Sequence, residues 1–283
     1  PITFMATANC IRYQGAKVVF ADVNPETLNI DPEKIKECIS PRTKAIIAVD
    51  FTGHPADLDA IGEVSKENKL VFIEDAAHAL PAFYKKQTIG TFSDAVCFSF
   101  YATKPLTTGE GGMVVTADED LFIRARSYHD HGHEYNSSKG RAEDGALLPG
   151  FNFRMTELQG AIGLVQLSKL DMILEKQRQN KKLLKNALRD CPFQFRKIID
   201  ADGDIGDALV FFLDTRDQTN RFVEKIRAVG LGTKNLHDAI RWHFSKYWEH
   251  LFLANGSKES NWNSRWTSSA ALLERAVALP IMV

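Results

Sequence analysis

The sequence predicts an α/β fold: a mostly parallel central sheet with helices on both faces, plus a smaller α+β domain at the C-terminal end. Three observations lead to this prediction. In the first half, short β-branched runs alternate with amphipathic stretches. These runs are nearly continuous in apolar residues, which is typical of strands covered on both faces. Past Cys191 the pattern changes to two apolar runs followed by a helix.

The elements of the first half follow this alternation in order. The expected strands are Val18–Val23, Ala45–Phe51, Leu70–Ala76, Ala95–Phe100 and Gly112–Thr116. The expected helices are Ala6–Gln14, Asp31–Ile39 and Leu58–Asn68. Because a strand–helix–strand order favours parallel crossover connections, we expect these strands to lie side by side in one sheet.

The second half begins with a polar loop after Gly132. The remaining expected elements are a long helix from Thr156 to Leu188, strands at Phe193–Ile198 and Ala208–Asp214, and a helix at Arg221–Val229. We therefore expect a large domain over residues 1–190 and a small one over residues 191–283. The chain begins without methionine and stops inside an apolar run, so we expect both domains to lack material at these ends.

Composition excludes several classes of function. The net charge of -1 provides no basic field for nucleic acid. No apolar run approaches the ~18 residues that span a bilayer, and no signal peptide is recognisable. The cysteines are scattered, which fits a reducing cytoplasm and argues against a disulfide framework. They are Cys10, Cys38, Cys97 and Cys191.

Two segments carry groups suited to catalysis. In "LVFIEDAAHA" an apolar strand ends at Asp75, with His78 three residues later, and the carboxyl ends of parallel strands are where ligands bind. Asp75 could equally cap the next helix. In "DAVCFSFYATKPLTTGEGG" apolar residues flank Lys104, and desolvation would make its amine nucleophilic. A surface lysine is the alternative. The lysine precedes the glycines, so this is no P-loop.

Four motifs in order, "TFMATAN", "FIEDAAHA", "FSFYATKPLTTGEGG" and "GFNFRMTELQGAIGLVQL", resemble those of the DegT/DnrJ/EryC1/StrS sugar aminotransferases. These are fold-type-I enzymes that use pyridoxal 5'-phosphate. The resemblance implies that Lys104 forms the internal aldimine and shuttles a proton. It also implies that Asp75 holds the pyridine nitrogen protonated, so that the ring can accept electrons.

The resemblance assigns further contacts to the cofactor and substrate. It implies His78 beside the 3-hydroxyl of the ring, Phe4 stacked on the ring, and Ser99 at the phosphate. Asn152 matches an asparagine that reaches the phosphate of the partner subunit, which implies a homodimer with shared active sites. Arg154 is expected to contact substrate. The family's small-residue phosphate cradle lies upstream of "TF", before this chain begins.

Two other clusters could be functional, but each also has a purely structural explanation. In "SYHDHGHEYN" the imidazoles and carboxylate of His129, Asp130, His131 and His133 could hold a metal, but the spacing matches no usual ligand motif. We therefore interpret it as a helix C-terminus ending near Gly132 and expect no metal. The aromatic stretch Arg241–Leu251 could line a substrate pocket, although core packing is the preferred interpretation.

The reaction implied is transfer of an amino group from L-glutamate to a keto sugar. The motifs are most similar to the branch that makes 8-amino-3,8-dideoxy-manno-octulosonate for lipopolysaccharide. The alternative is a nucleotide-linked 4-keto-hexose aminotransferase of the perosamine type. From other classes, a pyridoxamine-dependent sugar dehydrase would have histidine in place of Lys104, and an NAD-dependent oxidoreductase would need a G-x-G-x-x-G that is missing. A non-catalytic interaction protein remains open.

Overall fold

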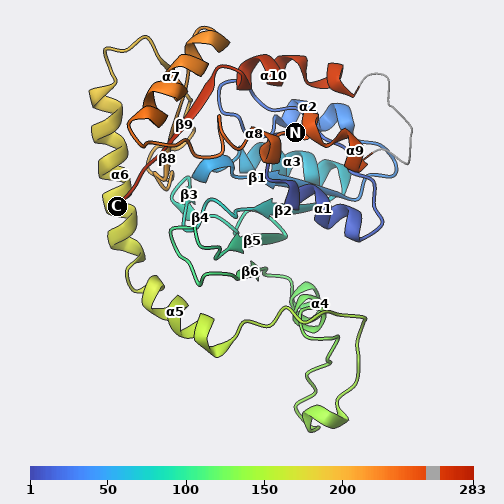
Figure 1. Cartoon of the computed structure of the whole chain (residues 1–283). Helices are drawn as coiled ribbons and strands as arrows, with labels where there is room; N and C mark the ends of the chain where they lie inside the picture. Colours follow the sequence, from blue (N-terminus) through green and yellow to red (C-terminus); the bar gives the residue numbers. More distant parts are fainter. Residues whose placement is uncertain (253–261) are drawn as a thin grey trace.

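The computed structural model describes residues 1–252 and 262–283. A four-stranded sheet, a three-stranded sheet and their helices make up the body, and residues 129–155, which we call the arm, project from it (Figure 1). None of the described helices is long and apolar enough to cross a bilayer.

The helices of the first half are α1 (Met5–Tyr13), α2 (Pro32–Cys38), η1 (Phe51–Gly53), α3 (Leu58–Asn68), α4 (Glu119–Tyr128) and η2 (Arg141–Glu143). Its strands are β1 (Ala45–Val49), β2 (Val71–Asp75), β3 (Phe83–Tyr84), β4 (Gln87–Thr88), β5 (Ala95–Ser99) and β6 (Gly112–Val115). The helices of the second half are α5 (Glu157–Leu167), α6 (Leu170–Ala187), α7 (Arg216–Ala228), α8 (Ile240–His243), η3 (Ser245–Trp248), α9 (Glu249–Phe252), η4 (Asn263–Trp266) and α10 (Thr267–Leu273). Its strands are β7 (Gln194–Phe195), β8 (Ala208–Phe212) and β9 (Ala276–Pro280).

The central sheet has the order β1-β2-β5-β6, with β1, β2 and β5 parallel and β6 antiparallel to β5. The predicted α/β class with a mostly parallel sheet is therefore confirmed. Pairing places Val49 opposite Asp75 and Asp75 opposite Cys97. The carboxyl ends of three strands consequently meet at one edge, which is where the sequence predicted a site.

The strand predicted at Val18–Val23 is wrong. This segment forms only an isolated bridge between Val23 and Ile30. Ala21 and Val23 are buried, so these two side chains pack in the interior although the backbone joins no ladder. The segment and β1, which is an edge strand of the sheet, both line a cavity of about 480 Å³.

The long helix predicted from Thr156 to Leu188 is in fact two helices. A capping box at Thr156 begins α5, which ends at Leu167, and α6 begins at Leu170. None of the residues of α5 is buried, whereas α6 buries Leu170 and Leu174 in the main core. The break therefore separates a helix that contributes residues to the main core from one that buries none of its own residues.

The C-terminal sheet has the order β7-β8-β9, all antiparallel. Strands β7 and β8 confirm the two predicted strands, although both are shorter than predicted. Helix α7 begins at Arg216, five residues before its predicted start, because a capping box forms at Thr215. Strand β9 was not predicted. Phe211 of β8 packs its ring against Phe193 and Phe222.

The buried guanidinium of Arg196 joins the two halves. It donates to the carbonyl oxygens of Thr27 and Phe51 and to the side chains of Thr52 and Asn29. A hydrophobic cluster crosses the same boundary, because Ile2 and Phe51 pack with residues of β8 and β9. The end of β1 is thus fixed by contacts from the C-terminal half.

Candidate active site

Asp75 ends β2 and lies partly buried at the carboxyl edge of the central sheet. The Thr7 hydroxyl donates to its Oδ2 at 2.6 Å, and the Ala77 N–H donates to its Oδ1 at 3.1 Å. Desolvation raises the pKa of Asp75, while these hydrogen bonds and the charge of Lys104 oppose the rise. The carboxylate is thus oriented by two donors and lies within electrostatic reach of Lys104.

Lys104 lies in a turn after β5. Its backbone N–H donates to the Tyr101 carbonyl oxygen at 2.9 Å. Desolvation, followed by the positive charge of Lys234, lowers the pKa of its amine to about 8. The carboxylates of Asp207 and Asp75 act in the opposite direction. A lysine with this pKa has an appreciable neutral fraction near pH 7, which is the form that attacks a carbonyl.

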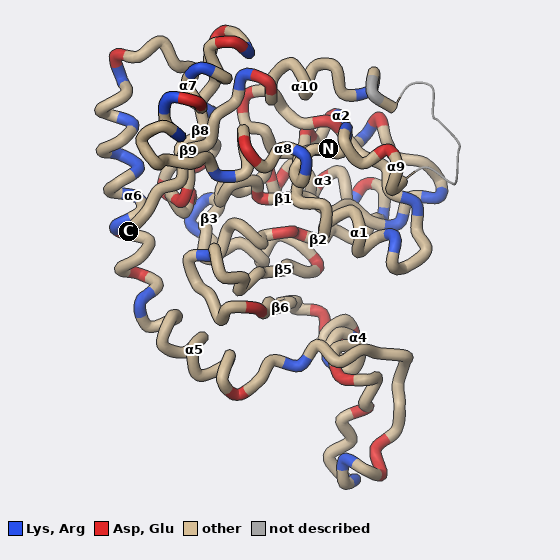
Figure 2. Tube along the Cα trace, in the orientation of Figure 1, with Lys and Arg blue, Asp and Glu red and all other residues tan. Residues whose placement is uncertain are grey.

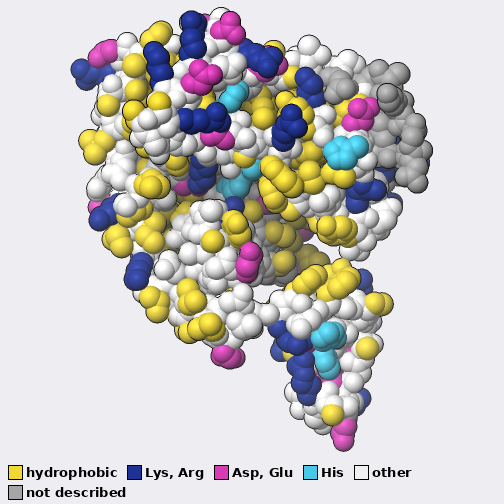
Figure 3. All heavy atoms as spheres, viewed as in Figure 1, with side chains coloured by type: hydrophobic (Ala, Val, Ile, Leu, Met, Phe, Trp, Pro, Cys, Tyr) yellow, Lys and Arg dark blue, Asp and Glu magenta, His cyan; other side chains and the backbone are white. Residues whose placement is uncertain are grey.

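His78, Phe4 and His243 extend this group into a cluster of rings. The ring centroids of His78 and His243 are 6.4 Å apart, and those of Phe4 and His243 are 5.4 Å apart. Desolvation and then the charge of Lys104 lower the pKa of His78 well below its usual value, so this imidazole is neutral. In Figure 3, basic, histidine and acidic side chains gather in a hollow near the middle of the visible face.

Of the other three predicted site residues, one lies at the same edge of the sheet and two lie on the arm. Ser99 ends β5 at the same sheet edge, where its Oγ accepts from the Tyr101 N–H at 3.3 Å. Asn152 and Arg154 lie on the arm, both exposed, and Asn152 forms a bridge with Asp130. The structure therefore brings together Asp75, Lys104, His78 and Phe4, and it places Asn152 and Arg154 on the arm.

Sequence reasoning missed several residues at this site. Thr7 lies one turn after Phe4 on α1, so its position within "TFMATAN" was a usable signal. Lys234 forms an ion pair with the buried Asp207, and both lie in segments with no recognisable motif. Their charges nevertheless act on the Lys104 amine.

The aromatic stretch Arg241–Leu251 divides between two roles. Trp248 is 1% exposed and packs in the core, as the preferred interpretation predicted. Trp242 is exposed and stacks near Phe4 at a centroid distance of 6.3 Å, and His243 touches the same ring. Its first part therefore belongs to the site.

The histidine cluster lies at the end of a helix, as interpreted from the sequence. Helix α4 ends at Tyr128, and His129 Nδ1 contacts the Arg126 carbonyl oxygen. Gly132 has a positive φ of 94°, and a Cβ there would collide with the Leu148 carbonyl oxygen at 1.8 Å, so only glycine fits.

The sequence pattern of the DegT/DnrJ/EryC1/StrS aminotransferase family matches residues 1–283. An uncharacterised protein of Methanocaldococcus jannaschii is 34% identical over 291 residues, covering 99% of this chain and 73% of that protein. The spore coat polysaccharide biosynthesis protein SpsC of Bacillus subtilis is 40% identical over 208 residues, covering 72% of this chain and 54% of SpsC.

Solved structures agree with this match. Helicobacter pylori PseC, an aminotransferase involved in the biosynthesis of pseudoaminic acid, superposes with a TM-score of 0.85 at 28% identity, covering 100% of this chain and 73% of PseC. An aminotransferase from Psychrobacter cryohalolentis gives a TM-score of 0.85 at 26% identity, with 100% and 74% coverage. The chain therefore belongs to the DegT/DnrJ/EryC1/StrS family of aminotransferases, which depend on pyridoxal phosphate.

Proposed function

We propose that this protein transfers an amino group from L-glutamate to a keto sugar, with Lys104 and Asp75 as its catalytic residues. The observation that carries the proposal is the pairing of the Lys104 amine, with its pKa of about 8, and the Asp75 carboxylate at one edge of the sheet. An amine and an acid held on the two sides of a pyridine ring are the groups that this chemistry requires.

The residues present fit pyridoxal phosphate. The Asp75 carboxylate is desolvated, and among the described residues it accepts from Thr7 and Ala77 without a hydrogen-bonded cation. His78 Nδ1 is buried and unpartnered within the described part of the chain. A protonated pyridine nitrogen and a ring hydroxyl would satisfy these two groups. The exposed face of Phe4 offers a stacking surface for the ring.

Bound pyridoxal phosphate would supply an electron sink when the substrate loses a proton. Asp75, fixed by Thr7 and Ala77, holds a proton at the ring nitrogen. Lys104 would carry a proton from the substrate carbon that bears the amino group to C4′ of the cofactor with glutamate, and from C4′ to the sugar carbon in the second half of the cycle, since its neutral form is accessible. Neutral His78 is assigned to the ring hydroxyl, and Ser99 to the phosphate.

We further propose that the protein acts as a homodimer whose sites are completed by Asn152 and Arg154 of a second copy. A broad exposed apolar surface supports this. The trace of β6 and α5 is almost free of charged residues (Figure 2), and Met113, Leu158 and Leu164 are 52%, 72% and 72% exposed. A face of this kind marks an interface.

We propose a sugar destined for a cell-surface glycan as the acceptor, with 8-amino-3,8-dideoxy-manno-octulosonate as the product. Two relatives support the broader class: SpsC is a spore coat polysaccharide biosynthesis protein, and PseC is involved in the biosynthesis of pseudoaminic acid. The motifs around the arm and around Arg241–Leu251 support the narrower product.

The test combines a spectrum with a substrate panel. Bound pyridoxal phosphate should give a visible absorption band that borohydride removes, with the label on Lys104. Lys104→Ala should fold normally, bind no cofactor covalently and lose transamination of every keto sugar in the panel with glutamate. Normal turnover by that variant would refute the assignment. A panel in which only non-sugar ketones react would refute the substrate class.

A further inference from the structure

A second lysine lies beside Lys104 and has no role in the chemistry proposed above. The ammonium group of Lys234 donates to Oδ2 of Asp207, and the two side chains are 22% and 2% exposed. Within the described part of the chain this ammonium group bonds to no other acceptor. Two of its three N–H donors therefore remain for a ligand.

Contacts around Asp207 place this ion pair at the edge of the sheet that carries Asp75. A Cβ at Gly53 would lie 3.1 Å from Oδ1 of Asp207, so the two residues are neighbours. Gly53 belongs to η1, which follows the carboxyl end of β1. Phe51 of the same short helix has its ring centroid 6.3 Å from that of His78. The ion pair and His78 therefore contact the same turn.

The charge of Lys234 acts on two groups that the proposed function places beside the reacting carbon. Desolvation is the main cause that lowers the pKa of Lys104 and of His78, and the positive charge of Lys234 contributes to both. Under the proposed function His78 faces the ring hydroxyl and Lys104 the adjacent aldehyde carbon, whereas Ser99 faces the phosphate. Lys234 is thus on the side of the ring where substrates react.

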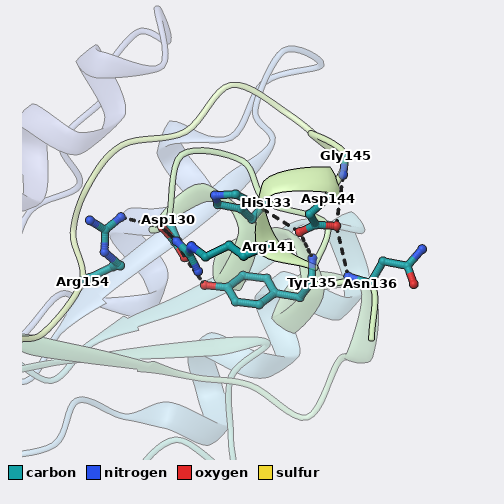
Figure 4. A network of polar contacts seen from close by, with 8 residues as sticks. All are labelled: Asp130, His133, Tyr135, Asn136, Arg141, Asp144, Gly145 and Arg154. Carbon is teal, nitrogen blue, oxygen red and sulfur yellow. Dashed lines mark hydrogen bonds and ion pairs between the residues drawn. The ribbon is translucent and has the colours of Figure 1, made fainter. Parts of the chain in front are cut away.

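The arginine that the sequence predicts for substrate contact is bound elsewhere in the chain. Arg154 Nη1 donates to Oδ1 of Asp130 at 2.6 Å, and Arg141 Nη2 donates to both oxygens of the same carboxylate on the arm (Figure 4). Lys234, in contrast, acts on the Lys104 amine. Within one chain, Lys234 is therefore the cation that the described residues place beside the reactive amine.

We propose that Lys234, with its ammonium group paired to Asp207, binds a carboxylate of the substrate. This inference rests on the proposed function, in which L-glutamate and the keto precursor of 8-amino-3,8-dideoxy-manno-octulosonate occupy one site in turn. Both molecules carry a carboxylate. An ammonium group already fixed by an ion pair loses little side-chain entropy on binding it. Partial burial strengthens this charge-assisted hydrogen bond, because less water competes for the donor.

Two pairs of unreactive ligands test the contact by calorimetry on the enzyme loaded with pyridoxal phosphate. The first pair imitates the donor: glutarate carries two carboxylates, and glutaramide has amides in their place. The second pair imitates the acceptor: 3-deoxy-manno-octulosonate carries a carboxylate, and its methyl ester does not. Wild-type enzyme should bind the acid more tightly in at least one pair. Equal binding within both pairs would overturn the proposal.

Lys234→Met removes the charge and keeps the length of the side chain. It should weaken the preferred acid by about tenfold or more and leave its neutral counterpart within about twofold. A loss for glutarate identifies the donor carboxylate, and a loss for the octulosonate identifies the acceptor carboxylate. The variant also raises the pKa of Lys104, which favours acids, so this indirect effect opposes the expected loss. Equal losses within a pair, or no loss for either acid, would overturn the proposal.

A double variant separates contact from net charge. Lys234→Met leaves Asp207 without its cation, and that carboxylate would repel acids from a distance. Lys234→Met/Asp207→Asn removes one charge of each sign and should lose the same preference for the acid. It also leaves no buried unpaired charge, so it tests the contact if the single variant folds poorly. A double variant with wild-type preference would overturn the proposal.

Lys181→Met is the matched control. Lys181 of α6 is also paired with a buried aspartate, Asp204, and these side chains are 16% and 7% exposed. Its loss should leave the binding of all four ligands within about twofold of wild type. A loss of acid binding equal to that in Lys234→Met would overturn the proposal.

Borohydride labelling of Lys104 separates this inference from the proposed function. A labelled wild-type enzyme with unchanged acid binding in Lys234→Met refutes the carboxylate contact alone. A wild-type enzyme that takes up no label on Lys104 refutes the proposed function.

Discussion

The amine of Lys104 should titrate near pH 8, because desolvation and the charge of Lys234 lower its pKa from 10.5 to about 8. At pH 7 about a tenth of such amines are neutral, compared with roughly 0.03% of amines with an ordinary lysine pKa. At pH 7 Lys104 should therefore react with an electrophile about 300-fold faster than an ordinary lysine of the same intrinsic nucleophilicity.

Competitive acetylation of the cofactor-free enzyme measures this titration. A trace of acetic anhydride is added between pH 6 and pH 11, and the labelled peptides are quantified by mass spectrometry, with the exposed lysines of α6 as the internal reference. The labelling midpoint of Lys104 should lie near pH 8. Lys234→Met should move it upward, because the cation that disfavours a second positive charge is removed.

Either of two results would refute this reasoning. A Lys104 midpoint above pH 10 would mean that water reaches the amine freely, so desolvation does not operate. An unchanged midpoint in Lys234→Met would mean that the ion pair with Asp207 cancels the charge of Lys234 at that distance.

Three further predictions concern the site and the core. Asp75→Asn should lower the rate of the glutamate half-reaction by about 100-fold or more in stopped-flow measurements, since an amide cannot hold the ring proton; a loss below about threefold would contradict this. Burial raises the pKa of Asp50 and Glu74, so the native state binds extra protons and stability falls as pH rises through these values. Glu74→Gln should therefore raise the melting temperature at pH 8, with a gain that shrinks towards pH 5; a constant gain would contradict the linkage. Phe211→Ala should cost about 3–5 kcal/mol in urea denaturation, because its ring is fully buried against Phe193; a cost below about 1 kcal/mol would show that the cavity collapses.

The central sheet and the position of Asp75 were predictable because the local sequence pattern there matches the burial of these residues in the fold. The runs at β1, β2 and β5 are apolar because the strands are buried, and Asp75 breaks the run at the point where the sheet edge begins. Lys104 was predictable from its apolar flanks and from the motif around it. Its pairing with Asp75 followed from the parallel order of β2 and β5.

The remaining features depend on contacts between residues distant in sequence. Val18–Val23 has the composition of a strand, but strand formation requires a neighbour for its ladder, which an apolar run does not reveal. Strand β9 resembles an ordinary apolar segment, and it becomes a strand through pairing with β8. Lys234 reaches the site because β9 holds its backbone, through the bond from the Lys234 N–H to the Ala278 carbonyl at 2.8 Å.

Because the buried side chain of Arg196 bonds to the N-terminal half, the two halves of this protein are difficult to produce separately. A polypeptide ending near residue 190 would keep the carbonyl groups of Thr27 and Phe51 but lose their donor, and each unsatisfied buried group costs about 1–3 kcal/mol. It would also expose the apolar residues that β8 and β9 cover. The two pieces made separately are expected to aggregate, whereas the same pieces produced together should assemble into one body, as a split reporter does.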